Sequence, residues 1–250
     1  MIQTNNNILR VHSIESFGTH DGPGIRMVVF LQGCKLKCLY CHNPDTIDTH
    51  GGKEYHIETL VQMAVKDKAY FGKKGGVTVS GGEPLLQSKA LVTFFKRLKE
   101  EGINTNIDTN GRVLNHFTED LLDNYADLVM LDIKHMTEEG YKALTGQRNK
   151  NTTFTFAKYR EASGKKMWLR YVLIPEITNK PELLHQMGVY FKDYKTIEKI
   201  EIQPYHKLGV HKWDALGWEY QLKDARENTK EEIDTAVNIL RNYFKEVKVN

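Results

Sequence analysis

Three cysteines lie within eight residues of one another, at Cys34, Cys38 and Cys41, and the rest of the chain has none. Thiols this close together are more typical of ligands to one metal centre than of disulfide partners, and an odd number cannot pair completely. A cubane 4Fe–4S cluster has four irons, so three cysteines leave one iron open to a small molecule. The spacing therefore predicts an open iron–sulfur centre in a reducing compartment.

A structural zinc site is the main alternative for the same cysteines, with His42 or a more distant histidine as the fourth ligand. Closed zinc sites usually combine two pairs of ligands, and the chain has no second Cys-x2-Cys pair. Three unrelated free thiols are a further alternative, but chance does not account for their clustering. We therefore favour the iron–sulfur interpretation, which metal analysis distinguishes from zinc.

Composition and charge narrow the class of protein. The chain has 250 residues, of which 40% are hydrophobic, and a formal net charge of +3, which is too small to indicate nucleic-acid binding by itself. The longest apolar run, Met27–Leu31, is far shorter than the ~20 residues of a membrane helix. The polar N-terminal leader, residues 1–7, lacks the basic start and apolar stretch of a secretory signal. These features predict a cytoplasmic globular protein.

Short β-rich segments alternate along the chain with longer amphipathic segments. The six predicted strands are Ile25–Leu31, Val77–Ser80, Asn104–Thr109, Leu128–Ile133, Trp168–Ile174 and Lys199–Gln203. Apolar residues have helical spacing in 57–65, in 91–98 and in 233–247, and Thr229-x-x-Glu232 before the last of these is a capping-box pattern. The alternation predicts parallel strands with helices outside. Six units rather than eight predict an α/β fold, a partial (β/α)6 barrel, as a single domain over residues 1–250.

Polar and glycine-rich motifs follow five of these strands. They are Gly33–Cys41, Ser80-Gly-Gly-Glu83, Asp108-Thr-Asn-Gly111, Asp132-Ile-Lys134 and Gln203-Pro-Tyr-His206. In parallel barrels the chemistry gathers where strands end and loops begin. We therefore expect the five motifs to share one rim with the cysteines.

The cysteine motif, with Tyr40 directly before the last cysteine, resembles the signature of the radical S-adenosylmethionine superfamily. Within it, several segments closely resemble the family of pyruvate formate-lyase activating enzymes. They are Glu15–Arg26, Gln32–Cys34, Tyr40–Asn43, Thr49–Lys53, Ser80–Pro84, Asp108–Gly111, Asp127–Asp132 and Gln203–His206. The similarity runs from about residue 8 to the C-terminus. It implies a partial barrel of the radical SAM type.

The resemblance also implies a chemistry. Cys34, Cys38 and Cys41 would hold a catalytic 4Fe–4S cluster, whose open iron would bind the amino and carboxylate groups of S-adenosyl-L-methionine (SAM). Reductive cleavage of SAM would give methionine and a 5′-deoxyadenosyl radical. That radical would abstract the Cα hydrogen of a glycine in pyruvate formate-lyase, under anaerobic conditions. The electron would come from a donor such as flavodoxin or ferredoxin, and the enzyme is expected to be a monomer.

Three further groups of residues receive roles from the resemblance. Contacts with SAM are expected from Tyr40, His42, Gly81, Gly82, Glu83, Asp132, Lys134 and His206. A monovalent cation (Na+ or K+) beside SAM is expected at Asp108, Thr109, Met130 and Asp132. The substrate peptide is expected to contact Asp21 and Arg26. Several of these residues also have a structural alternative. Gly81–Glu83 would be an ordinary strand-to-helix turn, Asp132 and Lys134 an exposed ion pair at a strand end, and His206 a core or rim histidine. Residues 211–228 are either a flap over the site or a packed surface excursion.

The cysteine count also bears on the substrate. Activases of most other glycyl radical enzymes carry a ferredoxin-like insertion with additional cysteines after the first motif, whereas residues 42–56 contain none. Pyruvate formate-lyase is therefore the favoured substrate. The alternatives are a radical SAM enzyme that acts on another glycyl radical protein or on a small molecule, and a zinc-stabilised binding module.

Overall fold

All six predicted strands are present in the computed structural model, which describes residues 6–250, and their ends fall within two residues of the predicted ends. Helices alternate with these strands, so the predicted α/β class is confirmed. The chain forms two compact units, one of residues up to 35 and 46–130, the other of residues 36–45 and 131–250. The single domain stays a prediction, and most of the leader, residues 1–5, lies outside the described residues.

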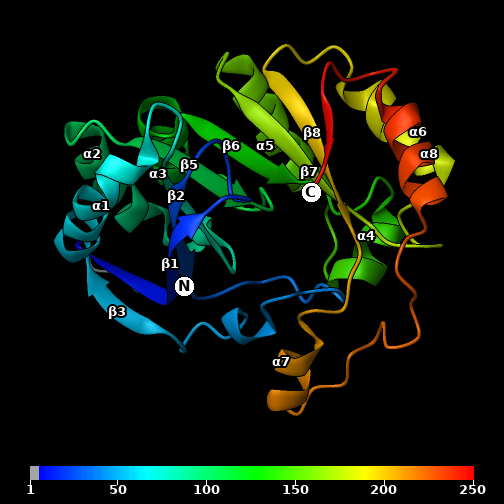
Figure 1. Cartoon of the computed structure of the whole chain (residues 1–250), viewed down its shortest axis with the longest axis horizontal. Helices are drawn as coiled ribbons and strands as arrows, with labels where there is room; N and C mark the ends of the chain where they lie inside the picture. The colour runs from blue at the N-terminus through cyan, green and yellow to red at the C-terminus, as the bar shows by residue number, and fades with distance from the viewer. Residues whose placement is uncertain (1–5) are drawn as a thin grey trace. The chain divides into compact units, whose positions relative to one another are not determined.

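The first unit is a sheet with helices packed beside it. Its strands are β1 (Ile8–Gly18), β2 (Arg26–Leu31), β3 (Lys53–His56), β4 (Gly76–Gly81) and β5 (Asn104–Thr109). Its helices are α1 (Ile57–Phe71), α2 (Ser88–Glu100) and α3 (His116–Asp120). The strand order is β3-β1-β2-β4-β5. In Figure 1, α1 and α2 lie together beside these strands.

Strand direction in this sheet follows from the lengths of the connections. β1 pairs antiparallel with both β2 and β3, whereas β2, β4 and β5 are parallel. Each parallel connection contains a helix, α1 or α2, as parallel pairing requires. α2 is amphipathic, because Leu91, Phe94, Phe95 and Leu98 recur every three or four residues, and all four are fully buried.

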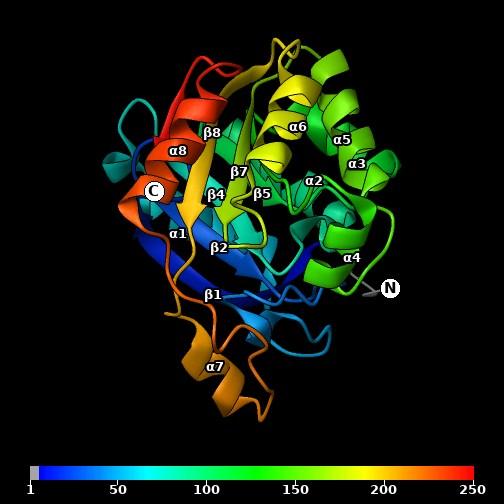
Figure 2. The same ribbon diagram turned by 90° about the vertical axis from the view of Figure 1, so that its right-hand side faces the viewer.

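The second unit repeats this architecture around three strands. Its elements are α4 (Glu138–Thr145), α5 (Asn151–Ala162), β7 (Met167–Leu173), α6 (Pro181–Phe191), β8 (Ile197–Pro204), α7 (Val210–Ala215), α8 (Lys230–Leu240) and β9 (Val247–Val249). β7, β8 and β9 are parallel neighbours. Figure 2 shows α6 and α8 next to β7 and β8, with α7 beyond the end of β8. The remaining strand is β6 (Leu128–Asp132). The boundary between the two units falls within it, between Met130 and Leu131.

Helices α6 and α8 meet at an unusually close contact. Gly188 is buried in the middle of α6, and a Cβ atom placed there would collide with the ring of Tyr243, just after α8. Tyr243 also shares a hydrogen bond of 2.9 Å with Nδ1 of His185 in α6. Glycine at position 188 therefore lets the tyrosine ring lie directly on the helix backbone.

Three strands, β1, β3 and β9, were not predicted from the sequence, and one predicted helix was too long. β1 and β3 have mixed burial and pair antiparallel at one edge, so they lack the continuous apolar pattern of the other strands. The last helical pattern, predicted to extend to Val247, ends at Leu240. Phe244 N and Arg241 N close the final turns, and Val247 begins β9 beside Ile200 instead.

The predicted capping box is confirmed at the start of α8. Thr229 Oγ1 accepts a hydrogen bond from Glu232 N at 3.2 Å, and Glu232 Oε2 accepts one from Thr229 N at 2.9 Å. We expect Thr229→Ala to lower the free energy of unfolding by about 1 kcal/mol, because one helix N–H loses its partner. Urea denaturation of the apo-protein measures this loss. Thr229→Ser, which keeps the hydroxyl, should be close to wild type, and equal losses in both variants would contradict the explanation.

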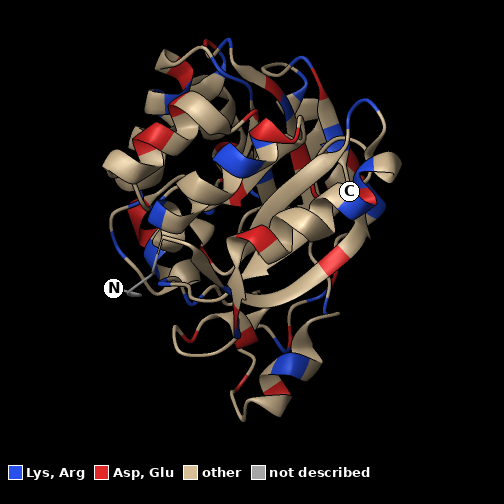
Figure 3. Cartoon of the chain, turned by 90° about the vertical axis from the view of Figure 1, so that its left-hand side faces the viewer, with Lys and Arg blue, Asp and Glu red and all other residues tan. Residues whose placement is uncertain are grey.

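Charges of both signs are spread over the described surface. Figure 3 shows Lys and Arg interspersed with Asp and Glu on the helices, in keeping with the small net charge. Among residues 6–250, no helix has the length and apolar character needed to span a membrane.

Candidate functional site

Two of the three cysteines lie in the second unit, on a loop held by α4. Leu39 N donates to Leu144 O at 3.0 Å, and Lys37 N donates to Thr145 O at 2.9 Å. The two cysteines are also joined by a turn, in which Cys41 N donates to Cys38 O at 3.0 Å. Backbone bonds to a helix end therefore fix the spacing of Cys38 and Cys41.

Cys34 belongs to the first unit, directly after β2. Its backbone N–H donates to Ile47 O at 3.2 Å, and the preceding Gly33 N donates to Thr46 O at 2.7 Å. All three cysteines are free thiols. Within residues 6–250, no group of three or more His, Cys, Asp and Glu side chains is arranged to hold a metal ion.

The cysteine thiols fit an iron–sulfur cluster by their chemistry. Burial raises the pKa of Cys38 to about 12, and burial also raises the pKa of Cys41. Such thiols stay protonated without a nearby cation, whereas a soft metal centre binds the thiolate and displaces the proton. Three thiols free of disulfides are the donor set that an iron–sulfur cluster needs.

A buried lysine lies beside the same loop. Lys134 Nζ forms an ion pair with Asp132 Oδ2 at 2.7 Å and lies 5.3 Å from the ring centroid of Tyr40. Burial opposes the charge, but Asp132 and Tyr40 outweigh it and hold the pKa of Lys134 well above its ordinary value. The second unit therefore places one ammonium group, with an acidic partner, next to Tyr40 of the cysteine motif.

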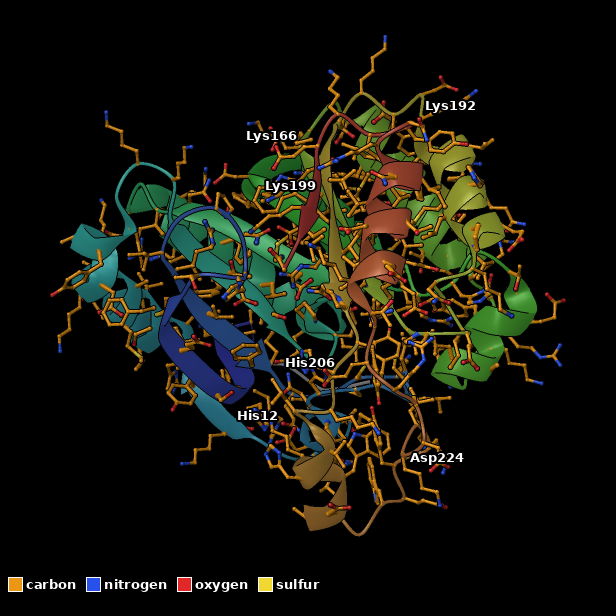
Figure 4. All side chains as sticks on the ribbon, turned by 45° about the vertical axis from the view of Figure 1, so that its right-hand side comes forward. His12, Lys166, Lys192, Lys199, His206 and Asp224 are labelled. Carbon is orange, nitrogen blue, oxygen red and sulfur yellow. The ribbon has the colours of Figure 1, made fainter. Side chains whose placement is uncertain are left out.

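The two predicted histidines of the second unit lie together. The rings of His42 and His206 have centroids 4.3 Å apart, and His42 Nε2 lies within hydrogen-bond distance, 3.3 Å, of the carbonyl oxygen of His206. Figure 4 shows His206 between the end of β8 and α7. Burial lowers the pKa of His42. Residues 164 positions apart in the sequence are thus brought into contact, as expected for motifs on one rim.

In the first unit, the Ser80-Gly-Gly-Glu83 motif joins the ends of three strands. Glu83 is buried, and its Oε1 accepts from Leu85 N at 2.9 Å and from Thr109 Oγ1 at 2.7 Å. Its Oε2 accepts from Asn110 N at 2.9 Å. Burial raises the pKa of Glu83 to about 7. The carboxylate therefore ties the end of β4 to the end of β5, and its contact with SAM stays a prediction.

The two glycines of this motif permit a close backbone approach. Gly81 has a φ of +111°, which disfavours any residue with a side chain. A Cβ atom at Gly82 would collide with the carbonyl oxygen of Gly33, directly before Cys34. The glycines therefore bring the end of β4 against the start of the cysteine motif, whether or not SAM lies there.

Three of the four residues expected at a monovalent cation have hydrogen-bond or ion-pair partners of their own. Asp108 Oδ2 accepts from Ser80 Oγ at 2.8 Å, and Thr109 Oγ1 donates to Glu83. Met130 is fully buried in the first unit, and Asp132 forms its ion pair in the second. The cation site stays a prediction.

The Asp21-Gly-Pro-Gly24 turn is fixed to the strands beneath it. Asp21 O accepts from Thr78 Oγ1 at 2.6 Å and from Asn106 Nδ2 at 3.0 Å. Arg26 is fully buried, and its guanidinium donates to Thr78 Oγ1 at 2.6 Å and Val77 O at 2.8 Å. This placement favours a structural role for Arg26, and its contact with a peptide stays a prediction.

Comparison with known proteins adds the deciding observation. The family model of the Radical SAM superfamily matches residues 28–187, a segment that contains all three cysteines. The chain belongs to the radical SAM superfamily. Its cofactors are accordingly a 4Fe–4S cluster and SAM. Cys34, Cys38 and Cys41 are the only cysteines in the chain, and their role as the cluster ligands stays a prediction.

Relatives within the superfamily are similar over nearly the whole chain. The pyruvate formate-lyase 1-activating enzyme of Escherichia coli (strain K12) is 45% identical over 237 residues, which cover 94% of this chain and 96% of that protein. The pyruvate formate-lyase-activating enzyme of Clostridium pasteurianum is 46% identical over 223 residues, 89% of this chain and 92% of that protein.

Solved structures support the fold. Streptococcus suis SuiB bound to its precursor peptide SuiA has a TM-score of 0.70 at 18% identity, over 95% of this chain and 50% of that chain. A domain of pyruvate-formate lyase-activating enzyme from Bacteroides vulgatus has a TM-score of 0.59 at 20% identity, over 70% of this chain and 99% of that chain. The radical SAM fold is therefore shared.

Sequence reasoning left one part of this radical SAM protein undecided, residues 211–228. The structure places Trp213 of α7 in a buried position, with its indole N–H on the carbonyl oxygen of Cys41. Trp218 nearby is 41% exposed. A tryptophan in a segment without periodicity gives no local sign of such a long-range contact, so the sequence offered no signal for it.

Proposed function

We propose that this protein activates pyruvate formate-lyase by generating a glycyl radical in it. The observation that carries the proposal is 45% identity, over 94% of the chain, to an enzyme named for that activity. When bound, the cluster and SAM supply a 5′-deoxyadenosyl radical by reductive cleavage of SAM, and this radical removes a glycine Cα hydrogen. The intact Cys-x3-Cys-x2-Cys motif supports the proposal.

In the second unit, Lys134 is suited to bind the carboxylate of SAM. Its side chain is only 10% exposed, and Asp132 keeps it charged. A charge-assisted hydrogen bond is strong when water is excluded. Tyr40, whose ring lies beside the ammonium group, adds an apolar wall. The rings of His42 and His206 lie against each other, tilted by 36°, and are suited to contact the adenosine portion.

In the first unit, we propose that the substrate peptide passes the Asp21-Gly-Pro-Gly24 turn. The carbonyl oxygen of Asp21 is held by Thr78 and Asn106, so the turn is positioned before a peptide arrives. Asp21 itself is partly exposed. Arg26 also holds the turn, because its guanidinium donates to Pro23 O at 3.1 Å.

We also propose that the protein works in the cytoplasm as a monomer and takes its electron from flavodoxin or ferredoxin. Lys35 and Lys37, within the cysteine motif, are exposed and carry positive charge. Exposed amines beside a redox centre suit the approach of an acidic protein. A monovalent cation at Asp108, Thr109, Met130 and Asp132 is proposed in addition.

The decisive experiment is anaerobic incubation of the reduced, cluster-loaded protein with SAM and pyruvate formate-lyase. We expect the electron paramagnetic resonance spectrum of a glycyl radical, together with one 5′-deoxyadenosine for each radical formed. Omission of SAM is the control. If SAM is cleaved but no glycyl radical forms, the protein acts on another glycyl radical enzyme or on a small molecule.

A substitution at Lys134 tests the proposed carboxylate site. We expect Lys134→Met to weaken SAM binding by about 10–100-fold, the effect of losing a hydrogen bond to a charged group. Isothermal titration of anaerobic, cluster-loaded protein with SAM measures the dissociation constant. Lys134→Arg keeps the positive charge and should lose less affinity. Equal affinities of Lys134→Met and wild type would show that Lys134 does not contact SAM.

A further inference from the structure

The segment that contains α7 contacts every residue from Cys41 to Asn43. We call residues 206–220, all in the second unit, the α7 brace. Trp213 Nε1 donates a hydrogen bond of 2.8 Å to the carbonyl oxygen of Cys41. Trp213 is 7% exposed, whereas Cys41 is half-buried. A cluster ligand is thus held through its own backbone by a residue far away in the sequence.

The next residue of the cysteine loop, His42, is held in two ways. Its ring lies against the ring of His206, and its Nε2 lies 3.3 Å from the carbonyl oxygen of His206. Its backbone lies against Gly209, where a Cβ atom would come within 2.7 Å of the Cα of His42. Only glycine at position 209 lets the brace approach the loop this closely.

An ion pair completes the contact at the end of the loop. Lys212 Nζ donates to Asn43 Oδ1 at 2.8 Å and lies 3.2 Å from Asp45 Oδ2. Lys212 and Trp213 are neighbours on the short helix α7. The helix therefore places its ammonium group and its indole on opposite ends of the same five-residue stretch.

The α7 brace is itself anchored to the sheet of the second unit. The rings of Trp213 and Tyr220 pack with centroids 5.5 Å apart, and the hydroxyls of Tyr220 and Tyr205 share a hydrogen bond of 2.8 Å. Tyr205 N donates to Leu173 O, at the end of β7, at 3.0 Å. A continuous path of side chains and backbone thus leads from β7 to the carbonyl oxygen of Cys41.

The exposure of other apolar residues in the brace shows which contacts hold it. Leu208 is 76% exposed and Trp218 is 41% exposed, whereas Trp213 is buried against the loop and Tyr220. The segment therefore does not bury its apolar residues generally, as a core helix does. Its buried residues, Trp213 and Tyr220, and the ion pair of Lys212 lie on the path between residues 41–45 and Tyr205.

We propose that Trp213 is a positioning residue for the cluster ligand Cys41, and that the α7 brace keeps residues 41–45 in the cluster-binding conformation. The inference rests on Cys41 being a cluster ligand. Hydrogen bonds and burial around ligands tune iron–sulfur clusters and retain the metal. The indole N–H supplies the hydrogen bond, and the buried ring packs between the loop and Tyr220.

The test compares Trp213→Phe, which keeps a ring but removes the N–H, with Trp213→Ala and with the matched control Trp218→Phe. Hydrogen–deuterium exchange of the full-length apo-protein is followed in a peptide that covers residues 36–45. We expect faster exchange there in Trp213→Phe and faster still in Trp213→Ala. Trp218→Phe should match wild type, because it keeps an aromatic ring beside Trp213, 6.1 Å from centroid to centroid, and leaves the hydrogen bond from Trp213 to Cys41 in place.

Iron release gives a second measurement, on the cluster-loaded protein. Loss of an outer hydrogen bond typically costs about 10–100-fold in metal affinity, so a chelator should remove iron from Trp213→Ala at least about tenfold faster than from wild type. The reduction potential of the cluster should also shift in Trp213→Phe and remain unchanged in Trp218→Phe.

Several outcomes would overturn the proposal. If Trp213→Phe lowers the thermal unfolding midpoint but leaves exchange in residues 36–45, iron release and potential at wild-type values, Trp213 is a core residue only. If Trp213→Ala does not fold, Trp213→Phe and Lys212→Met decide the question by the same measurements. If wild type binds no iron, the cluster assignment fails instead, and exchange in the apo-protein still tests the brace.

Discussion

Replacement of Cys38 by alanine is expected to abolish both cluster assembly and cleavage of SAM. After anaerobic reconstitution, iron and sulfide should fall to background, and no methionine or 5′-deoxyadenosine should form. The physical reason is that two thiolates would remain for four irons, with no other cysteine in the chain to replace the third. Cys38 is also the most buried of the three cysteines, so water does not readily replace its thiolate as a ligand to iron.

Lys37→Ala is the matched control for this variant. Lys37 is an exposed neighbour in the same loop, and its anchoring bond to Thr145 O comes from the backbone, which the substitution keeps. It should assemble a full cluster and cleave SAM with a chemical reductant. Full iron content in Cys38→Ala would refute the ligand assignment. A colourless wild-type protein with about one zinc per chain would favour the zinc alternative.

Replacement of Arg26 by methionine is expected to cause the largest loss of stability. Arg26 is fully buried, and its guanidinium donates to Thr78 Oγ1, Val77 O and, at 2.9 Å, Asn104 Oδ1. Methionine fills similar space but leaves several buried acceptors without a donor. Each unsatisfied group costs about 1–3 kcal/mol, so we expect a total loss of about 2–5 kcal/mol.

Urea denaturation of the apo-protein measures this loss, with Arg97→Met as the control. Arg97 forms ion pairs with Glu58 and Glu100 on the surface, and exposed pairs of this kind contribute about 0–1 kcal/mol. An equally small effect at Arg26 would show that its buried hydrogen bonds are dispensable. A stable Arg26→Met protein that cleaves SAM but no longer activates pyruvate formate-lyase would instead support the predicted peptide contact.

The sequence was sufficient for features that depend on local pattern. The six strands, the amphipathic spacing of Leu91, Phe95 and Leu98, and the capping box at Thr229 each follow from residues a few positions apart. The cysteine motif is equally local. Such patterns reflect backbone periodicity and short-range hydrogen bonds, which the order of residues specifies directly.

Features that depend on distant residues were the ones that the sequence did not reveal. Arg26 is a charged residue beside a turn, which usually indicates exposure, yet carbonyl groups from two other strands enclose it. The carboxylate of Glu83, in a glycine-rich loop, accepts hydrogen bonds from Thr109 and Asn110 of another strand end, which the sequence did not indicate. Trp213 lies 172 positions from Cys41. No local rule relates residues so far apart.

The close contact between Gly188 and Tyr243 limits which substitutions can raise the stability of this protein. Replacing a glycine inside a helix by alanine ordinarily stabilises a protein by about 0.4–1 kcal/mol. At position 188 the added methyl group would meet an aromatic ring that is itself tethered to His185. Stabilising substitutions should therefore be made at other positions, and Gly188 should be kept.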